Sequence, residues 1–310
     1  MQTGIKIAIL GAGHVGSHVA LECALQGLSR EIVLLDTDRK KAEGHAMDIL
    51  DALAYSSHNV NVYEGWYDAV ADADIAVMCA CATGYESSDR LKELMPTLKV
   101  ADEVATGLIG CGFHGMVVSI SNPCDLIAQY LQAKTGLTVI GTGTALDSGR
   151  FRARLAQALN VVVSSVQGYC LGEHGDSQVP ALSTVTVGGI PLKAVMASHP
   201  GIDFQNICLE TKKAGWEIVL GKGCTEFGIG SAAARLVKAI VNDEQAILPC
   251  SVPLHGTYGG DGIYAGVPCR VGRLGAEPMP EFSLDEEEQN ALARSFQVLK
   301  SHIPEDIISK

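Results

Sequence analysis

The stretch LGEHGDSQVP, residues 171–180, places one histidine, His174, between acidic residues and glycines. Its neighbours lack the apolar periodicity of a packed helix or strand, so the pattern does not indicate a role in the core. Histidine is the side chain that most readily changes charge near neutral pH. His174 is therefore the first candidate for a residue that does chemistry.

Two charged residues, Asp147 and Arg150, lie three positions apart in GTGTALDSGRFR, residues 141–152. We predict a helix over TALDSGRFRARLAQAL, which begins at Thr144, and positions three apart lie on one face of a helix. From spacing alone, an ion pair on a solvated helix face is the simpler interpretation. A chemical role for the pair stays open at this point.

Two further polar residues follow a predicted strand and a polar segment. Asn122 ends a predicted strand directly before a proline, in SNPCD. Arg90 begins a predicted helix after TGYESSD, residues 83–89. Since Asn-Pro is an ordinary turn signal and most arginines are surface charges, local sequence assigns neither residue a role.

A glycine-rich loop near the start of the chain, GAGHVG, has the spacing of a dinucleotide-binding turn. In the G-x-G-x-x-G pattern the first glycine allows the tight turn, the second lets the backbone approach a pyrophosphate, and the third packs helix on strand. The N–H groups at the start of the following helix can bind phosphate. The predicted cofactor-binding residues of this loop are Gly11, Gly13, Val15 and Gly16.

Asp36 ends the next apolar run, EIVLLD, residues 31–36. Such an acid could be a turn residue, but its place after a strand, glycine loop and helix strengthens the dinucleotide pattern. A carboxylate there accepts hydrogen bonds from the ribose hydroxyls and repels a ribose phosphate. The sequence therefore predicts NAD rather than NADP as the cofactor.

Apolar strands alternate with helices in the first half of the chain. Strands that are apolar on both faces and separated by helices are typical of a parallel sheet covered on both sides. We therefore predict an α/β fold with a doubly wound parallel sheet (the Rossmann arrangement), forming an NAD-binding domain over residues 1–144. The predicted strands are 5–10, 31–36, 75–80, 116–121 and 137–142, and the predicted helices include 39–53, 90–108 and 124–136.

The pattern changes in the second half. A helix is followed by TVTVGGIPL, which suggests an antiparallel strand and turn, and by two longer helices near 203–220 and 228–242. Ser283 and Glu286 have the spacing of a capping box at the start of the last helix. We predict a C-terminal α+β substrate domain over residues 145–310, joined to the first by no Pro-rich linker.

Composition limits the partners and the location. The 310 residues include 23 Lys and Arg against 35 Asp and Glu, a net charge of −12, which argues against a nucleic-acid partner. No apolar run is long enough for a membrane span, and the start of the chain lacks the apolar core of a signal peptide. The ten cysteines have no zinc-like spacing, so we predict no metal site, and reduced thiols indicate the cytoplasm.

The motifs occur together over nearly the whole chain, in the order GAGHVG, LLDTDRKKAEGHAMDI, SNPCD, GTGTALDSGRFR and GEHGDS. In this combination the sequence closely resembles the L-lactate and malate dehydrogenase family. GFHG before SNP, and KKAGWEIVLGKGCTEFG over residues 212–228, look most like L-2-hydroxyisocaproate dehydrogenases. The resemblance implies an NAD-dependent L-2-hydroxy acid dehydrogenase, which transfers hydride reversibly between NADH and a 2-oxo acid.

The resemblance also implies roles for the candidate residues. His174 would give a proton to the carbonyl oxygen of the 2-oxo acid and remove it in the reverse direction. Asp147 would bind the other ring nitrogen, and Arg150 would bind the substrate carboxylate through its planar guanidinium. Asn122 would hydrogen-bond near the reacting oxygen and border the cofactor. Arg90 would polarise the carbonyl from a loop that closes over the substrate.

Small residues match the positions that surround the substrate side chain. Gly84 and Gly215, the latter next to Ala214, would leave room for a branched aliphatic group. Thr225 matches a position beside the substrate, and Ile229 one beside the nicotinamide. We therefore expect pyruvate and ketoisocaproate to be accepted, and oxaloacetate to be poor because its second carboxylate would lack a partner.

Two alternatives stay open. A malate dehydrogenase would need a cation for the second carboxylate, and no Lys or Arg stands between Thr83 and Asp89. A catalytically silent, NAD-binding regulatory protein would lack a catalytic residue, whereas the full set is present. We also expect the chain to form a homo-oligomer, either a dimer or a tetramer.

Overall fold

Six parallel strands form one part of a nine-stranded sheet in the computed structural model, which describes residues 4–82 and 90–304. Their order is β3–β2–β1–β4–β5–β6, so the chain moves outward from β1 first in one direction and then in the other. This is the doubly wound arrangement that the alternation of strands and helices predicts. The strands are β1 (Lys6–Leu10), β2 (Glu31–Leu35), β3 (Asn61–Glu64), β4 (Ile75–Met78), β5 (Met116–Ser119) and β6 (Val139–Gly141).

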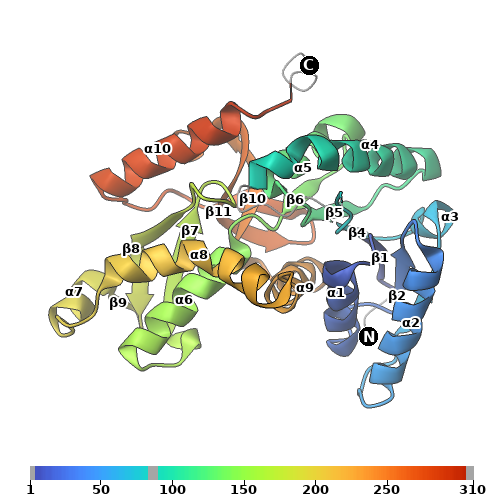
Figure 1. The fold of residues 1–310 in the computed structure, drawn as a ribbon, viewed down its shortest axis with the longest axis horizontal. Helices are drawn as coiled ribbons and strands as arrows, with labels where there is room; N and C mark the ends of the chain where they lie inside the picture. Colours follow the sequence, from blue (N-terminus) through green and yellow to red (C-terminus); the bar gives the residue numbers. More distant parts are fainter. Residues whose placement is uncertain (1–3, 83–89, 305–310) are drawn as a thin grey trace.

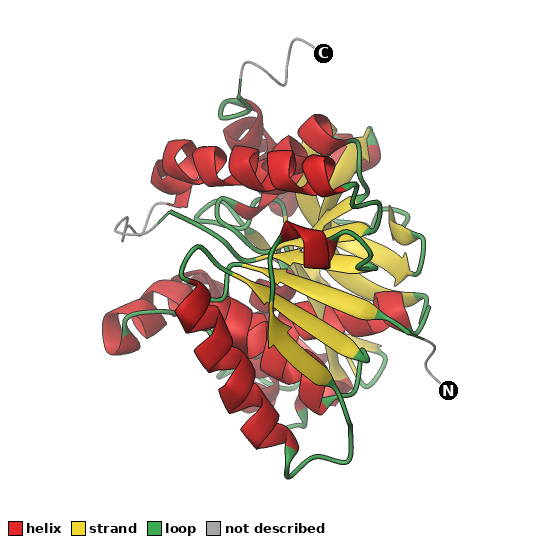
Figure 2. Ribbon diagram, turned by 90° about the vertical axis from the view of Figure 1, so that its right-hand side faces the viewer, coloured by secondary structure: helices red, strands yellow, loops and turns green. Residues whose placement is uncertain are grey.

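Helices cover both faces of the parallel strands (Figures 1 and 2). One pair, α1 and α2, lies against one face, and α4 and α5 lie against the other. The helix predicted for residues 90–108 begins as a 3-10 helix, Arg90–Glu93, before α4 continues it. The helices of this half are α1 (His14–Leu25), α2 (Arg39–Leu53), α3 (Tyr67–Val70), α4 (Leu94–Cys111) and α5 (Cys124–Thr135).

The sequence pattern does not predict β3. This strand has four residues at the edge of the sheet, and only Val62 among them is buried. A strand with a single buried position carries too little apolar pattern to be recognised in isolation.

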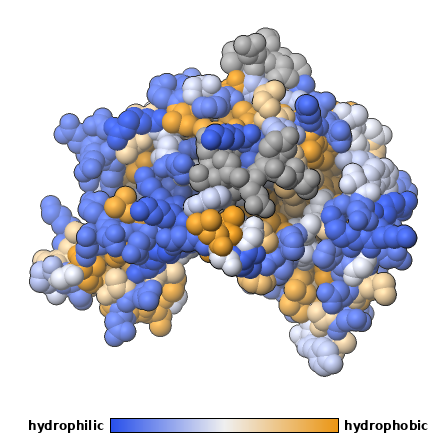
Figure 3. Space-filling view, viewed as in Figure 1, coloured by the Kyte–Doolittle hydropathy of each residue, from blue (hydrophilic) through white to orange (hydrophobic). Residues whose placement is uncertain are grey.

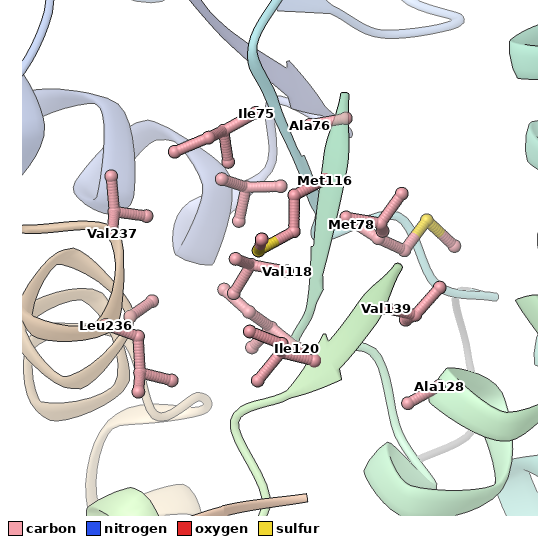
Figure 4. Close-up of a cluster of buried hydrophobic side chains, with 14 of the residues drawn as sticks. Ile75, Ala76, Met78, Met116, Val118, Ile120, Ala128, Val139, Leu236 and Val237 are labelled. Atoms are coloured by element: carbon pink, nitrogen blue, oxygen red, sulfur yellow. The ribbon is translucent and has the colours of Figure 1, made fainter. Parts of the chain in front are cut away.

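The core packs against both faces of the central strands. Figure 4 shows Val118 of β5 directed toward Leu236 and Val237 of α9 (Phe227–Val241), whereas Val139 of β6 lies on the side of Ala128 of α5. Because a buried strand packed on both sides has little freedom to move, the carboxyl ends of β1, β4 and β5 are fixed points for the loops that follow them.

A smaller antiparallel sheet, β7–β8–β9, forms in the second half, as the strand and turn at TVTVGGIPL predict. It shares a separate core with α6 and α8, which includes Phe151, Leu155, Val185 and Phe204. The two longer helices predicted here are present as α8 and α9. The elements are α6 (Ala145–Leu159), β7 (Val166–Leu171), β8 (Val179–Val187), β9 (Ile190–Pro191), α7 (Leu192–Ala197) and α8 (Phe204–Lys222).

Three later strands return to the large sheet. They are β10 (Ala246–His255), β11 (Asp261–Gly272) and β12 (Gly275–Pro278), and β10 joins β6 in antiparallel fashion with Ser251 opposite Gly141. The sequence pattern does not predict these three strands, and in β10 Pro249 and Pro253 weaken the strand pattern. The large sheet therefore runs across the domain boundary predicted at residue 144.

The last helix, α10 (Glu286–Lys300), begins with a capping box, but not the predicted one. Asp285 accepts a hydrogen bond from the Glu288 N–H at 2.8 Å, and Glu288 accepts one from the Asp285 N–H at 3.2 Å. The prediction of Ser283 and Glu286 is wrong by two positions, because the chain stays extended as far as Asp285 and only then turns into the helix.

The surface is mainly polar. Figure 3 shows hydrophilic residues over most of one face, with apolar residues gathered in separate patches. Within residues 4–82 and 90–304, no helix combines the length and the apolar character that crossing a bilayer requires.

Candidate active site

A cavity of about 150 Å³ lies at the carboxyl ends of β4 and β5, between the parallel sheet and the second half of the chain. A larger hollow of about 680 Å³ lies at the opposite ends of these strands, beside Ile75 and Met116, but none of the residues singled out from the sequence lines it. The smaller cavity is lined by eight of them, namely Val15, Asn122, Asp147, Arg150, His174, Gly215, Thr225 and Ile229.

His174 and Asp147 form a close pair in this cavity. His174 lies in the loop between β7 and β8, and its Nδ1 is 2.6 Å from Oδ2 of Asp147 on the first turn of α6. Asp147 is only 1% exposed, and burial alone would raise its pKa. The charge and hydrogen bond of His174, with the nearby Arg150 guanidinium, outweigh burial and lower the pKa of Asp147. The carboxylate therefore stays ionised and stabilises positive charge on the imidazole.

Arg150 lies one helical turn beyond Asp147 on α6. Its Nη1 is 3.3 Å from Asp147 Oδ1, and its side chain is 12% exposed. Gly215 of α8 lies directly against the guanidinium, because a Cβ added there would be 3.3 Å from Arg150 Nη1. A glycine at position 215 thus leaves the space beside the guanidinium open for a substrate.

Asp125 holds the backbone at His174, a role that the sequence analysis missed. Its Oδ2 accepts a hydrogen bond from the His174 N–H at 2.8 Å, and its Oδ1 accepts one from the Ser251 hydroxyl at 2.5 Å. Asp125 is 1% exposed, and burial raises its pKa from an ordinary 3.8 to about 6. The one available signal is an acid in SNPCD just after the strand, since its partners are 49 and 126 positions away.

The start of the histidine loop is anchored to the large sheet. Gly172 exchanges two backbone hydrogen bonds with Gly266 of β11, at 2.9 and 2.8 Å. Its φ of +88° lies in the left-handed region that favours glycine. His174 is therefore positioned from β11, from α5 and from α6 together.

The glycine loop has the shape that a dinucleotide pyrophosphate requires. A Cβ at Gly11 would lie 2.6 Å from Cα of Ala80, and a Cβ at Gly16 would collide with the carbonyl oxygen of Gly11. A Cβ at Gly13 would meet nothing within 4 Å, and Gly13 makes no side-chain cap at the start of α1. The start of α1 thus has room for a phosphate, which the first N–H groups of a helix can bind.

Asp36 follows β2, where the ribose of a dinucleotide is expected. Its side chain is 11% exposed, its Oδ1 accepts a hydrogen bond from the Asp38 N–H at 2.9 Å, and its Oδ2 is 2.9 Å from Lys41 Nζ. Lys41 thus adds a positive charge beside this carboxylate, which the sequence analysis did not consider.

Asn122 carries a buried acceptor at the edge of the cavity. Its Oδ1 is shielded from solvent and has no hydrogen-bond partner within the described part of the chain. A buried polar atom of this kind fits a ligand that brings an N–H or O–H group. The residues at this end of β5 therefore suit a bound NAD. Gly84 and the side chain of Arg90 lie outside the described residues.

Comparison with known proteins places the whole chain in one group. Residues 5–141 match the family description "lactate/malate dehydrogenase, NAD binding domain", and residues 144–307 match "lactate/malate dehydrogenase, alpha/beta C-terminal domain". The L-lactate dehydrogenase of Fusobacterium nucleatum is 37% identical over 305 residues, covering 96% of each chain.

Solved structures agree. The minor L-lactate dehydrogenase from Enterococcus mundtii has a TM-score of 0.93 at 36% identity, covering 97% of this chain and 98% of its own. The malate dehydrogenase from Cryptosporidium parvum has a TM-score of 0.92 at 27% identity, covering 99% and 100%. Both enzymes share the full fold with this chain.

Proposed function

The chain belongs to the lactate/malate dehydrogenase family and is an NAD-dependent dehydrogenase of the lactate type, and from this premise we propose that its substrates are 2-oxo acids with neutral side chains. It converts them reversibly to L-2-hydroxy acids. The observation that carries this proposal is the position of His174, Asp147 and Arg150 beside Gly215 in one cavity.

The proposed chemistry follows from the contacts of His174. NADH, when bound, supplies the hydride for the carbonyl carbon. Since Asp147 accepts the hydrogen bond of Nδ1, Nε2 is the nitrogen that donates a proton to the carbonyl oxygen. Arg150 pairs with the substrate carboxylate and so fixes which face of the carbonyl is presented. In the reverse direction, neutral His174 removes the hydroxyl proton.

The substrate side chain is proposed to occupy the space beside Gly215. Glycine there adds no volume, whereas Ala214 before it is buried and is not one of the residues that line the cavity. Each methylene buried in such a space is worth about 0.8 kcal/mol. A branched 2-oxo acid such as ketoisocaproate is therefore accepted at least as well as pyruvate.

One observation favours the alternative of a malate dehydrogenase. Lys212 of α8 is half-buried and lines the same cavity, where it could meet a second carboxylate. Such a cation is expected from the sequence in the loop before Arg90, whereas Lys212 lies far along the chain from that loop. The alternative of a silent NAD-binding protein is disfavoured by the close pairing of His174 with Asp147.

Initial rates of NADH oxidation with pyruvate, ketoisocaproate and oxaloacetate test these proposals. We expect kcat/KM for ketoisocaproate to be at least comparable with that for pyruvate, and both to exceed that for oxaloacetate. A strong preference for oxaloacetate that Lys212→Met removes would establish the malate alternative. No turnover with any of the three would favour a silent protein.

We also propose that the enzyme acts in the cytoplasm as a homo-oligomer. All ten cysteines are free thiols, and six of them are buried, which supports a reducing compartment such as the cytoplasm.

Exposed apolar side chains on α2 support the proposal of a homo-oligomer. Met47 and Leu50 lie one turn apart on the outer side of this helix, with 62% and 42% of their surface exposed, and could be covered by another subunit. Light scattering after gel filtration distinguishes a monomer from a dimer or tetramer.

A further inference from the structure

A second cluster of reactive side chains lies where the start of α1 meets the turn between α8 and α9. His14 is the first residue of α1, Cys224 lies in the turn, and Glu226 is the N-cap of α9. A ring nitrogen of His14, Sγ of Cys224 and a carboxylate oxygen of Glu226 all lie within 4.8 Å of one another. The proposed reaction uses none of these three side chains.

Glu226 is held in place by its neighbours. Its Oε1 pairs with Lys222, whereas its Oε2 lies 3.2 Å from His14 Nδ1 and 3.8 Å from His18 Nδ1. The side chain is 11% exposed, and the rings of His18 and Phe227 meet edge-to-face at 4.7 Å where α1 packs on α9. The carboxylate is therefore fixed by packed helices, with one oxygen directed to the imidazoles.

The separations fit a tetrahedral transition-metal ion. Zn²⁺ binds nitrogen, oxygen and sulfur at about 2.0–2.3 Å, so two of its tetrahedral ligands lie roughly 3.3–3.7 Å apart. The contact of 3.2 Å between His14 and Glu226 already has nearly this length. The remaining donors lie within 4.8 Å and need an approach of about 1 Å, which the 78% exposed His14 side chain has room to make.

The donor types select the class of ion. Thiolate and imidazole ligands suit Zn²⁺ and similar transition metals, whereas Mg²⁺ and Ca²⁺ prefer oxygen ligands alone. A plain ion-pair cluster needs only Lys222, Glu226 and the imidazoles. In such a cluster the Cys224 thiol only hydrogen-bonds to Glu226, whereas in a metal site its sulfur binds the ion as a thiolate. This thiol is therefore the residue that separates the two explanations.

We propose that His14, Cys224 and Glu226 form a binding site for a Zn²⁺-class divalent ion, which joins the first turn of α1 to the turn between α8 and α9. The Cys224 thiol proton passes to solvent when Sγ binds the ion, and Lys222 keeps its contact with Oε1. Water takes the fourth position. The sequence shows no zinc-like spacing here because His14 and Cys224 are 210 positions apart.

Titration of the metal-free, full-length protein with Co²⁺ tests the site, because Co²⁺ bound to a thiolate gives a charge-transfer absorption. We expect one Co²⁺ per chain, displacement by Zn²⁺, and a higher unfolding temperature when Zn²⁺ is present. Cys224→Ser should remove the charge-transfer band. His14→Asn and Glu226→Gln should each weaken binding by about tenfold or more, the scale expected when one of three ligands is lost.

Cys111→Ser is the matched control, since Cys111 is also a half-buried thiol but lies at the far end of α4. This variant should bind Co²⁺ as the parent does. The proposal is overturned if no thiolate band appears, if the band survives Cys224→Ser, or if His14→Asn leaves the affinity unchanged. His14 is exposed, so that variant should fold even if Glu226→Gln does not. None of these measurements depends on turnover, so they stand apart from the proposed function.

Discussion

In the half of the site that is expected to hold the cofactor, the backbone of the glycine loop forms the binding surface. Gly11 and Gly16 lie where any Cβ would collide with neighbouring chain, whereas a Cβ at Gly13 would meet nothing within 4 Å, and no side chain caps the start of α1. In the half that is expected to hold the substrate, the side chains of Asp147 and Asp125 position His174 through hydrogen bonds. The first half is specified by a short stretch of sequence, whereas the second depends on the whole fold.

This difference implies that binding and chemistry can be separated by mutation. His174→Gln should retain NADH binding and lose roughly 10²–10⁴ in turnover, the usual contribution of a positioned acid–base group. NADH binding is measured by fluorescence titration, and turnover by single-turnover kinetics. Turnover within a few-fold of the parent would show that the substrate half does not depend on the imidazole.

A change in the cofactor half should have the opposite signature. Asp36→Ala removes the acceptor for the ribose hydroxyls and frees Lys41 to meet a ribose phosphate. We expect the preference for NADH over NADPH, measured as a ratio of kcat/KM, to fall by about tenfold or more, the scale of a hydrogen bond to a charged group. The limiting rate with saturating NADH should stay close to that of the parent. An unchanged ratio would mean that Asp36 does not select the cofactor.

Substitution of Asp125 should have the smallest of the three effects on the reaction, because Asp125 acts through the backbone of His174. Asp125→Asn keeps an acceptor for the His174 N–H but loses the charge, so we expect only a several-fold fall in kcat with little change in the KM for the 2-oxo acid. A fall in kcat as large as that of His174→Gln would place Asp125 in the reaction.

The raised pKa of Asp125 gives the same variant a second, independent readout, which is the pH dependence of its free energy of unfolding. Burial raises this pKa from 3.8 to about 6, so between these values the folded chain holds a proton that the unfolded chain has lost. Stability from this group is therefore present at low pH and falls as pH rises toward 6, by about 3 kcal/mol in all. We expect the free energy of unfolding of Asp125→Asn, measured with urea, to rise relative to that of the parent as the pH rises from 4 to 7. A difference that is the same at both pH values would contradict this account.

Local pattern predicts most of the parallel half of the fold. The helix predicted at residues 39–53 has those bounds in the structure, and the five predicted strands correspond to β1, β2, β4, β5 and β6. Each of these elements carries its own signal, either a buried apolar run or a helical period. The edge strand β3 and the proline-bearing β10 carry no such signal and were missed.

The site divides in the same way. The glycine loop and Asp36 could be derived from spacing, and the roles of His174, Asp147 and Arg150 rested on resemblance to a family. Neither spacing nor resemblance predicts three other features of the structure, namely the pair of Asp125 with Ser251, Lys212 in the cavity, and the cluster of His14 with Cys224. They become neighbours only through contacts between segments far apart in the chain, which spacing cannot express.

The junction of β6 with β10 has a consequence for how the chain is made. During synthesis the first 144 residues emerge before β10 exists, and β6, a strand of three residues, is then the uncovered outer strand of the sheet. Such an edge can pair with a strand of another chain. A nascent or truncated N-terminal half is therefore exposed to aggregation until more than a hundred further residues have been added and β10 covers that edge.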